Sequence, residues 1–238
     1  MIIDFHTHIG RSRDGAYQSI SDTLKTMKQF GIERSFVFPI DEPNPGPSYQ
    51  KLNRTIAGII KKHKNIFGCA RLNPKELKAS HYEIEQAVRH GFRAVKFHPR
   101  SDRFCAKDAK PLLQAIADNK LIVILHTDHH SNCHPQNWFS IFLKYPKTYF
   151  ILTHAGKDVF SQAIYAAKNF SRVYLDTSTI SYYRTGVILK QAGVRKVVFA
   201  SDIPYSHAAL EIKKFELLLP RANRKWVFRE NARKILGL

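Results

Sequence analysis

Residues 121–154 read LIVILHTDHHSNCHPQNWFSIFLKYPKTYFILTH. This stretch contains two short apolar runs, Leu121–His126 and Thr148–His154, whose length is typical of buried strands. Residues 135–145, between them, have the spacing of an amphipathic helix. A strand, a helix and a second strand in this order predict a βαβ unit, in which the two strands lie parallel.

The same alternation of strands and helices continues in both directions along the chain. Six further strands are predicted at Ile2–His8, Arg34–Ile40, Ile66–Leu72, Ala94–His98, Val173–Asp176 and Lys196–Asp202. Further helices are predicted at 20–30, 49–63, 84–88 (ending at Gly91), 108–119, 157–169, 180–192, 206–218 and 223–236. Eight such units in 238 residues predict an α/β fold, a (β/α)8 TIM barrel forming a single domain over residues 1–238 with a C-terminal helix. A doubly wound open sheet is the main alternative, because counting strands does not show closure.

The composition is that of an ordinary globular protein. Hydrophobic residues make up 44% and charged residues 24% of the chain, which excludes wholesale disorder. No apolar run approaches the ~20 residues of a membrane span, and an acid at Asp4 is atypical of a signal peptide. The three cysteines, Cys69, Cys105 and Cys133, are widely spaced and indicate reduced thiols. We therefore expect a cytoplasmic protein with no membrane contact.

The net charge of +19 is less ordinary. The excess of basic residues is spread along most of the chain rather than gathered in a tail. Such a field attracts anions of any kind, nucleic acid included, without identifying the ligand. A solvated basic surface is the preferred interpretation, and a small anionic substrate is preferred to nucleic acid as partner.

Histidines recur at the carboxyl ends of the predicted strands. The groups concerned are His6, His8, His98, His126, His154 and, at strand eight, Asp202. In a parallel barrel these ends share one rim, where barrel active sites are built. Imidazole and carboxylate ligands suit Zn²⁺ first, with Mn, Fe or Co as alternatives. Three histidines and an aspartate with water would form a catalytic metal site.

Acidic residues near these histidines have supporting roles in this interpretation. Asp4 is two residues from His6 on one strand, so we expect both on one face, with Asp4 orienting an imidazole. Asp176 ends strand seven, where it would either support a metal ligand or cap a turn. The segment Asp128–His134 is expected to form a polar loop over the site.

Several segments, taken in order, form a specific set: Ile3-Asp4-Phe5-His6-Thr7-His8, Gly91–Pro99, His126, Thr153-His154-Ala155-Gly156, Ser201-Asp202-Ile203-Pro204 and Glu230–Leu238. This set resembles the amidohydrolase superfamily, and within it the amidohydrolase-2 group, which includes decarboxylases related to aminocarboxymuconate-semialdehyde decarboxylase. The resemblance covers nearly the whole chain and also suggests a homodimer.

The resemblance implies roles for individual residues. The metal, with a water, would be held by His6, His8, His126 and Asp202. His154 would orient or polarise that water, or bind a second metal. Asp202 would also take the water's proton, which makes His154 and Asp202 the candidate catalytic residues.

Strand four leaves the number of metals open. Lys96 lies on the same strand face as His98. It could carry a carbamate that bridges two metals, bind substrate as a cation, or pair with an acid; one metal is favoured. Arg11 and Arg100, together with Lys96 and His98, are the candidate substrate-binding residues, because arginines clamp carboxylates in bidentate fashion. Loop arginines on a basic surface are the alternative.

These observations predict an enzyme. The first hypothesis is a metal-dependent hydrolase of an ester, lactone or amide of a small anionic substrate. The alternative is a non-oxidative decarboxylase of an unsaturated or aromatic carboxylic acid. A basic barrel that binds nucleic acid ranks below both, because charge does not explain the histidines at the strand ends.

Overall fold

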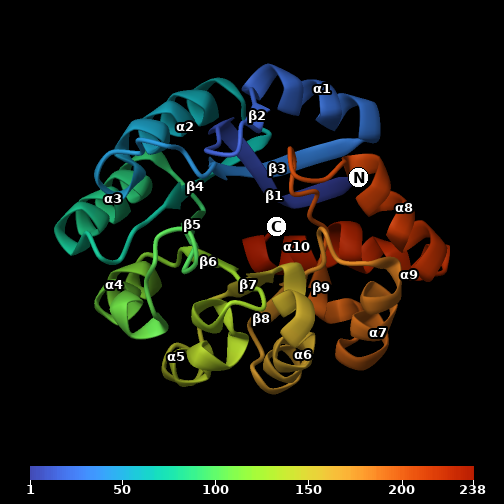
Figure 1. Cartoon of the computed structure of the whole chain (residues 1–238). Helices are drawn as coiled ribbons and strands as arrows, with labels where there is room; N and C mark the ends of the chain where they lie inside the picture. Colours follow the sequence, from blue (N-terminus) through green and yellow to red (C-terminus); the bar gives the residue numbers. More distant parts are fainter.

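The computed structural model describes all residues, 1–238. Eight parallel strands form a ring with the helices outside it (Figure 1). The strands are β1 (Ile2–Arg11), β3 (Ile32–Pro39), β4 (Ile66–Arg71), β5 (Ala94–Phe97), β6 (Ile122–His126), β7 (Phe150–Thr153), β8 (Val173–Asp176) and β9 (Val197–Val198). All eight predicted strands are present, and each pairs with the next along the chain. An additional short strand, β2 (Tyr17–Gln18), pairs antiparallel with the end of β1 and was not predicted.

Backbone hydrogen bonds between β1 and the β9 segment close the ring. The Phe5 amide donates to the Phe199 carbonyl at 3.0 Å, and the His8 amide to the Ile203 carbonyl at 2.8 Å. In the other direction the Asp202 amide donates to the His6 carbonyl at 2.7 Å. The predicted TIM barrel is therefore confirmed, and the open sheet is excluded.

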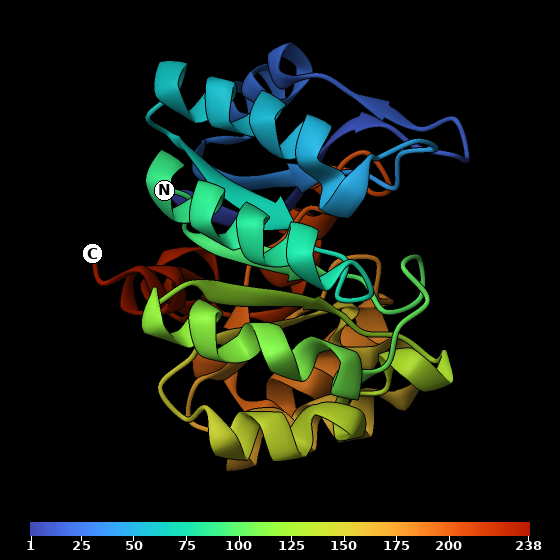
Figure 2. The same ribbon diagram turned by 90° about the vertical axis from the view of Figure 1, so that its left-hand side faces the viewer.

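The helices cover the outside of the barrel. They are α1 (Ile20–Phe30), α2 (Gln50–Lys62), α3 (Leu77–His90), α4 (Ala106–Asp118), α5 (Phe139–Lys144), α6 (Phe160–Asn169), α7 (Tyr182–Ala192) and α8 (Ala208–Leu218). None of the helices has the length and apolar character needed to span a bilayer. The predicted helix 223–236 is instead three pieces: α9 (Arg221–Lys225), a π-helical turn and α10 (Asn231–Leu236). Ala232 and Ile235 of α10 pack into the barrel interior at the end where both chain termini lie (Figure 2).

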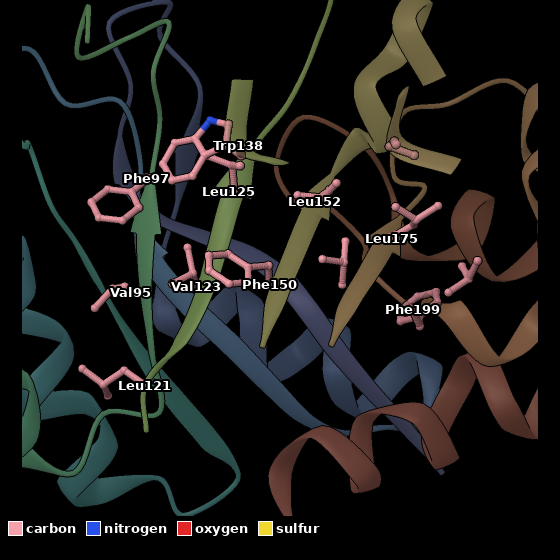
Figure 3. Packing of buried hydrophobic residues seen from close by; sticks show 14 of the residues in the cluster. Val95, Phe97, Leu121, Val123, Leu125, Trp138, Phe150, Leu152, Leu175 and Phe199 are labelled. Carbon is pink, nitrogen blue, oxygen red and sulfur yellow. The ribbon is translucent and has the colours of Figure 1, made fainter. Parts of the chain in front are cut away.

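Side chains alternate between two hydrophobic clusters. On β6, Val123 and Leu125 point outward and pack under the helices, as do their counterparts on β5 and β7 (Figure 3). Ile122 and Ile124 point inward and join a smaller cluster inside the barrel. His126 continues the inward row. The interior therefore changes from apolar to polar toward the carboxyl ends of the strands.

This alternation is interrupted in β1. The pairing of β1 with β3 shifts register between Asp4 and Thr7, and Phe5 belongs to the inner cluster. The prediction that Asp4 orients an imidazole is wrong, because its carboxylate accepts hydrogen bonds from the backbone amides of His6 (2.9 Å) and Ser201 (3.0 Å) instead. Asp4 thus ties β1 to the segment after β9.

Gly68 of β4 lies directly against the buried Phe92 ring. A Cβ placed on Gly68 would lie 1.8 Å from that ring. Gly68→Ala is therefore expected to lower the free energy of unfolding by ~1–3 kcal/mol through overpacking, measured by urea denaturation. Gly58→Ala on α2 is the matched control, since no atom lies within 4 Å of its added Cβ. Equal stability of the two variants would contradict the prediction.

Candidate active site

A polar hollow of about 380 Å³ opens at the carboxyl ends of the strands. In Figure 2 these strand ends lie on the side of the barrel opposite the two termini. It is lined by His6, His8, Ser12, Arg13, Asp14, Asp41, Arg71, Lys96, His98, Arg100, Ser101, His126, His154, Lys157, Asp202 and Tyr205. Every candidate site residue from the sequence is among them except Arg11. These candidate residues come from the carboxyl ends of five strands, β1, β5, β6, β7 and β9, or from the segments that follow them.

Three ligand atoms converge at the floor of the hollow. His6 Nε2 and His8 Nε2 each lie 3.0 Å from Asp202 Oδ1 and 3.2 Å from each other. All three side chains are buried. Lone pairs this close repel unless a proton or a cation lies between them. The donor set therefore fits a divalent metal ion.

Asp176 fixes the orientation of the first of these imidazoles. Its Oδ2 lies 2.6 Å from His6 Nδ1, which leaves Nε2 of His6 free to bind a metal. Burial alone would lower the pKa of His6, but the carboxylates of Asp202 and Asp176 raise it. Oδ1 of Asp176 accepts the Ser178 amide at 2.6 Å. Asp176 therefore both orients the His6 imidazole and caps the turn at Ser178.

His154 and Asp202 share an unusual backbone conformation. Their φ angles are +58° and +55°, in the left-handed region. Residues other than glycine occupy this region at a cost, and they are enriched at functional sites. His154 directly follows β7, Asp202 lies in the segment after β9, and both side chains line the hollow.

His154 is a neutral imidazole. Burial lowers its pKa to about 4. Its Nδ1 lies 3.1 Å from the Ser178 carbonyl, an acceptor, so Nδ1 carries the proton. The lone pair is then on Nε2, and His154 can accept a proton or bind a metal. It cannot donate a hydrogen bond to a developing oxyanion in this state.

His126 lies in the hollow but outside the tightest group. Its Nε2 is 3.0 Å from Asp128 Oδ2, so Nδ1 is the nitrogen left to bind a metal. Its ring stacks on His98 with centroids 3.8 Å apart and lies 4.9 Å from the His154 ring. Burial holds the pKa of both His98 and His126 well below the usual range. The assignment of His126 as a ligand stays a prediction.

Lys96 is buried without a hydrogen-bond partner at Nζ. The ammonium lies 4.7 Å from the centroid of the Phe38 ring, and no carboxylate is within ion-pair distance. Burial lowers its pKa to about 8. The structure thus does not show pairing with an acid, one of the three roles considered for Lys96. A carbamate or a substrate-binding cation remains.

One of the two predicted substrate-binding arginines lies outside the hollow. Arg11 is exposed and lies over Tyr17 of the β1–β2 ladder, with its Cζ 5.1 Å from the ring centroid. Arg13 and Arg100 both line the hollow, and Arg100 lies 3.4 Å from Asp128. The strand pairing of β1 with β2 carries Arg11 away from the hollow.

Sequence reasoning missed Arg71, which ends β4. The side chain is 1% exposed and lies 2.9 Å from Asp102 and 3.4 Å from Asp41. Its Cζ is 4.0 Å from the centroid of Tyr49, whose hydroxyl donates to Asp102 at 2.7 Å. The rule that identified the histidines, a polar residue closing an apolar strand, applies equally to Arg71.

Asp176→Asn is expected to weaken metal binding ~10–100-fold, because the supporting carboxylate orients His6 and raises its basicity. Competition with a chromogenic chelator measures the change. Asp158→Asn is the control, since that carboxylate is 56% exposed and pairs only with surface groups. Unchanged metal affinity in Asp176→Asn would contradict the role assigned to it.

Comparison with known proteins identifies the family. The amidohydrolase family model matches residues 3–238. No curated protein sequence matches the chain significantly. Among solved structures, 2,6-dihydroxybenzoate decarboxylase from Rhizobium superposes with a TM-score of 0.78 at 15% identity, covering 99% of this chain and 98% of the other.

Two further structures have the same fold. A dihydroxybenzoic acid decarboxylase from Polaromonas, with bound manganese and 2-nitroresorcinol, gives a TM-score of 0.75 at 16% identity, covering 100% and 97% of the two chains. A protein from Pseudomonas putida assigned as a 2-pyrone-4,6-dicarboxylic acid hydrolase gives 0.69 at 15% identity, covering 99% and 97%. With the family model matched over nearly every residue, the chain belongs to the amidohydrolase family and is an enzyme of that superfamily.

Proposed function

We propose that this enzyme is a metal-dependent hydrolase of an ester, lactone or amide bond in a small anionic substrate. The observation that carries the proposal is the convergence of His6 Nε2, His8 Nε2 and Asp202 Oδ1 within 3.0–3.2 Å at the floor of the hollow. These residues, with His126 through Nδ1, would hold the metal. A bound divalent ion would polarise a carbonyl and lower the pKa of a water. Zinc is the first choice for these ligands, with manganese or iron as alternatives.

Asp202 is suited to accept the proton of the attacking water. Burial alone would raise its pKa, but His6 and His154 hold that pKa well below the usual range, so the carboxylate is ionised at neutral pH. Oδ1 contacts the two imidazoles, which leaves Oδ2 to take the proton. Nε2 of the neutral His154 would orient the same water by accepting a hydrogen bond.

The cations of the hollow support an anionic substrate. The lining contains Arg13, Arg71, Lys96, Arg100 and Lys157. Lys96 is buried at the carboxyl end of β5, and its Nζ has no partner. A volume of about 380 Å³ suits a small molecule. A substrate carboxylate facing Lys96 and Arg100 would satisfy both groups.

A non-oxidative decarboxylase is the second candidate. The observation that favours it is the superposition with two aromatic-acid decarboxylases over nearly the full chain. The two reactions are separable, because hydrolysis in ¹⁸O-water places the label in the organic product, whereas decarboxylation releases CO₂ and leaves no ¹⁸O in the organic product. Free thiols at all three cysteines support a cytoplasmic location for either enzyme.

Metal content tests the central element of the proposal. We expect about one divalent ion per chain by elemental mass spectrometry, as in mononuclear sites of this ligand type. His126→Ala should lose the ion, whereas Lys96→Ala should retain it. A panel of lactones, esters and aromatic acids then identifies the reaction. Two ions per chain that fall with Lys96→Ala would indicate a carbamate-bridged pair, and no ion after reconstitution would overturn the proposal.

A further inference from the structure

A second hollow, of about 560 Å³, lies at the opposite end of the barrel from the candidate active site. Five basic residues line it: Arg93, Lys120, Lys147, Arg172 and Lys234. We propose that this basic hollow binds a small organic polyphosphate, a compact ring carrying two or more phosphate groups, as in nucleotides. Neither the strand-end histidines nor the proposed hydrolysis uses these residues.

The barrel places the five cations in one arc. Arg93 directly precedes β5 and Arg172 directly precedes β8. Lys120 and Lys147 lie in the loops that lead into β6 and β7. Because these four strands are consecutive neighbours in the sheet, their amino ends lie side by side. Lys234 of α10, the helix that closes this end in Figure 2, completes the arc.

The five cations of the basic hollow form no ion pairs within the protein. None of the five cations is within 4.0 Å of a carboxylate, whereas ion pairs occur elsewhere on the surface. Asp118 is the one acid in the lining, and its Oδ1 accepts a hydrogen bond from Gln114 at 2.8 Å. Five like charges around one concavity create a potential that concentrates anions there.

Arg172 is held ready to bind an oxyanion. Its Nη1 donates to the Lys147 carbonyl at 2.8 Å, and its Cζ lies 4.5 Å from the centroid of the Tyr149 ring. The half-buried side chain therefore loses little freedom on binding. A guanidinium presents several N–H groups in one plane, and the geometry matches two oxygens of a phosphate.

The floor of the basic hollow is apolar. Leu121, Ile122, Ile235 and Leu236 form it together with Tyr149. A simple inorganic anion would use only the cations of the rim. A ligand with an uncharged ring would also cover this floor, and the volume is within the range of small-molecule sites. The combination of rim and floor thus favours an organic polyphosphate.

Isothermal titration calorimetry with ATP tests the proposal. Inorganic tripolyphosphate serves as a second probe that lacks a ring, and each titration is done at about 50 and about 200 mM salt. We expect saturable 1:1 binding of ATP to the full chain, and weaker binding of tripolyphosphate. The triple variant Arg93→Gln/Lys147→Gln/Arg172→Gln should weaken ATP binding about 100-fold, because the substitutions remove three charge-assisted contacts. A thermal unfolding curve of the triple variant verifies that the protein folds.

Two control variants locate the binding. The first control, Lys107→Gln/Lys110→Gln/Lys190→Gln, removes three positive charges from exposed positions on α4 and α7. This variant should bind ATP as the wild type does. Arg13→Gln/Arg100→Gln removes cations from the candidate active site and should also retain binding. Equal weakening in the first control would mean a diffuse charge effect, and loss in the second would mean binding at the active site; either overturns the proposal.

The remaining outcomes are equally decisive. Absence of saturable ATP binding at low salt would overturn the proposal. Tight binding of a single-stranded RNA that depends on the same three residues, without ATP binding, would make the basic hollow part of a nucleic-acid surface and would also overturn it. These results leave the proposed hydrolase untouched, because its test rests on metal content at the other end of the barrel.

Discussion

Asp202→Asn is expected to lower kcat/KM by ~10³-fold or more. General-base assistance from a positioned carboxylate accelerates a reaction by about 10²–10⁴-fold, and the asparagine side-chain amide is also a weaker metal ligand. The amide cannot take a proton from water at neutral pH. The barrel should keep its fold, since the backbone amide of Asp202 still donates to the His6 carbonyl. Initial rates on whichever panel substrate the wild type turns over measure the effect.

The control for this prediction separates chemistry from stability and metal loss. Asp158→Asn removes an exposed carboxylate that does not line the hollow and should retain the wild-type rate. Circular dichroism and metal analysis of Asp202→Asn accompany the rates. Turnover near that of the wild type in a variant that still holds its metal would show that the assigned proton acceptor is wrong.

The second large effect concerns stability rather than rate. Arg71→Met is expected to lower the free energy of unfolding by ~3–5 kcal/mol, because breaking a buried ion pair leaves an uncompensated charge. Asp102 is 4% exposed at its side chain and would lose the guanidinium 2.9 Å away. Tyr49, whose ring Arg71 covers, would lose a cation–π contact as well. Urea denaturation followed by fluorescence measures the loss.

Two further variants keep this prediction testable even if Arg71→Met folds poorly. Arg71→Met/Asp102→Asn removes both charges and should regain part of the stability, since no unpaired carboxylate remains. Arg34→Met is the surface comparison: its side chain is 35% exposed and lies 3.9 Å from Glu33, so its loss should cost no more than ~1 kcal/mol. A cost for Arg71→Met as small as that for Arg34→Met would refute the role of the buried pair.

The strands and most of the site could be predicted because both follow from short-range regularities. An apolar run such as Ile122–Leu125 forms a buried strand wherever it is paired, and the parallel topology then places its carboxyl end at the common rim. His126, His154 and Asp202 are at the hollow for this reason. The same rule applies to Arg71, the last residue of β4, which the sequence analysis did not include.

Residues that depend on the path of a loop could not be predicted in this way. Arg11 and Arg13 are two apart and chemically alike, yet only Arg13 lines the hollow. The difference arises from the pairing of β1 with β2. This ladder has only two residue pairs, which is too short for a periodic sequence pattern to predict. The choice between one loop arginine and its neighbour therefore rests on tertiary contacts.

The amino-acid sequence by itself determined the TIM barrel and the rim that carries the imidazoles, because hydrophobic periodicity and strand direction act locally and repeat eight times. Only the tertiary structure decided which acid supports which histidine. A shift of register in β1 turns Asp4 toward backbone amides, while Asp176, 170 positions from His6, reaches its Nδ1 at 2.6 Å. Such pairings depend on distances across the closed barrel, which exist only after all the strands have assembled.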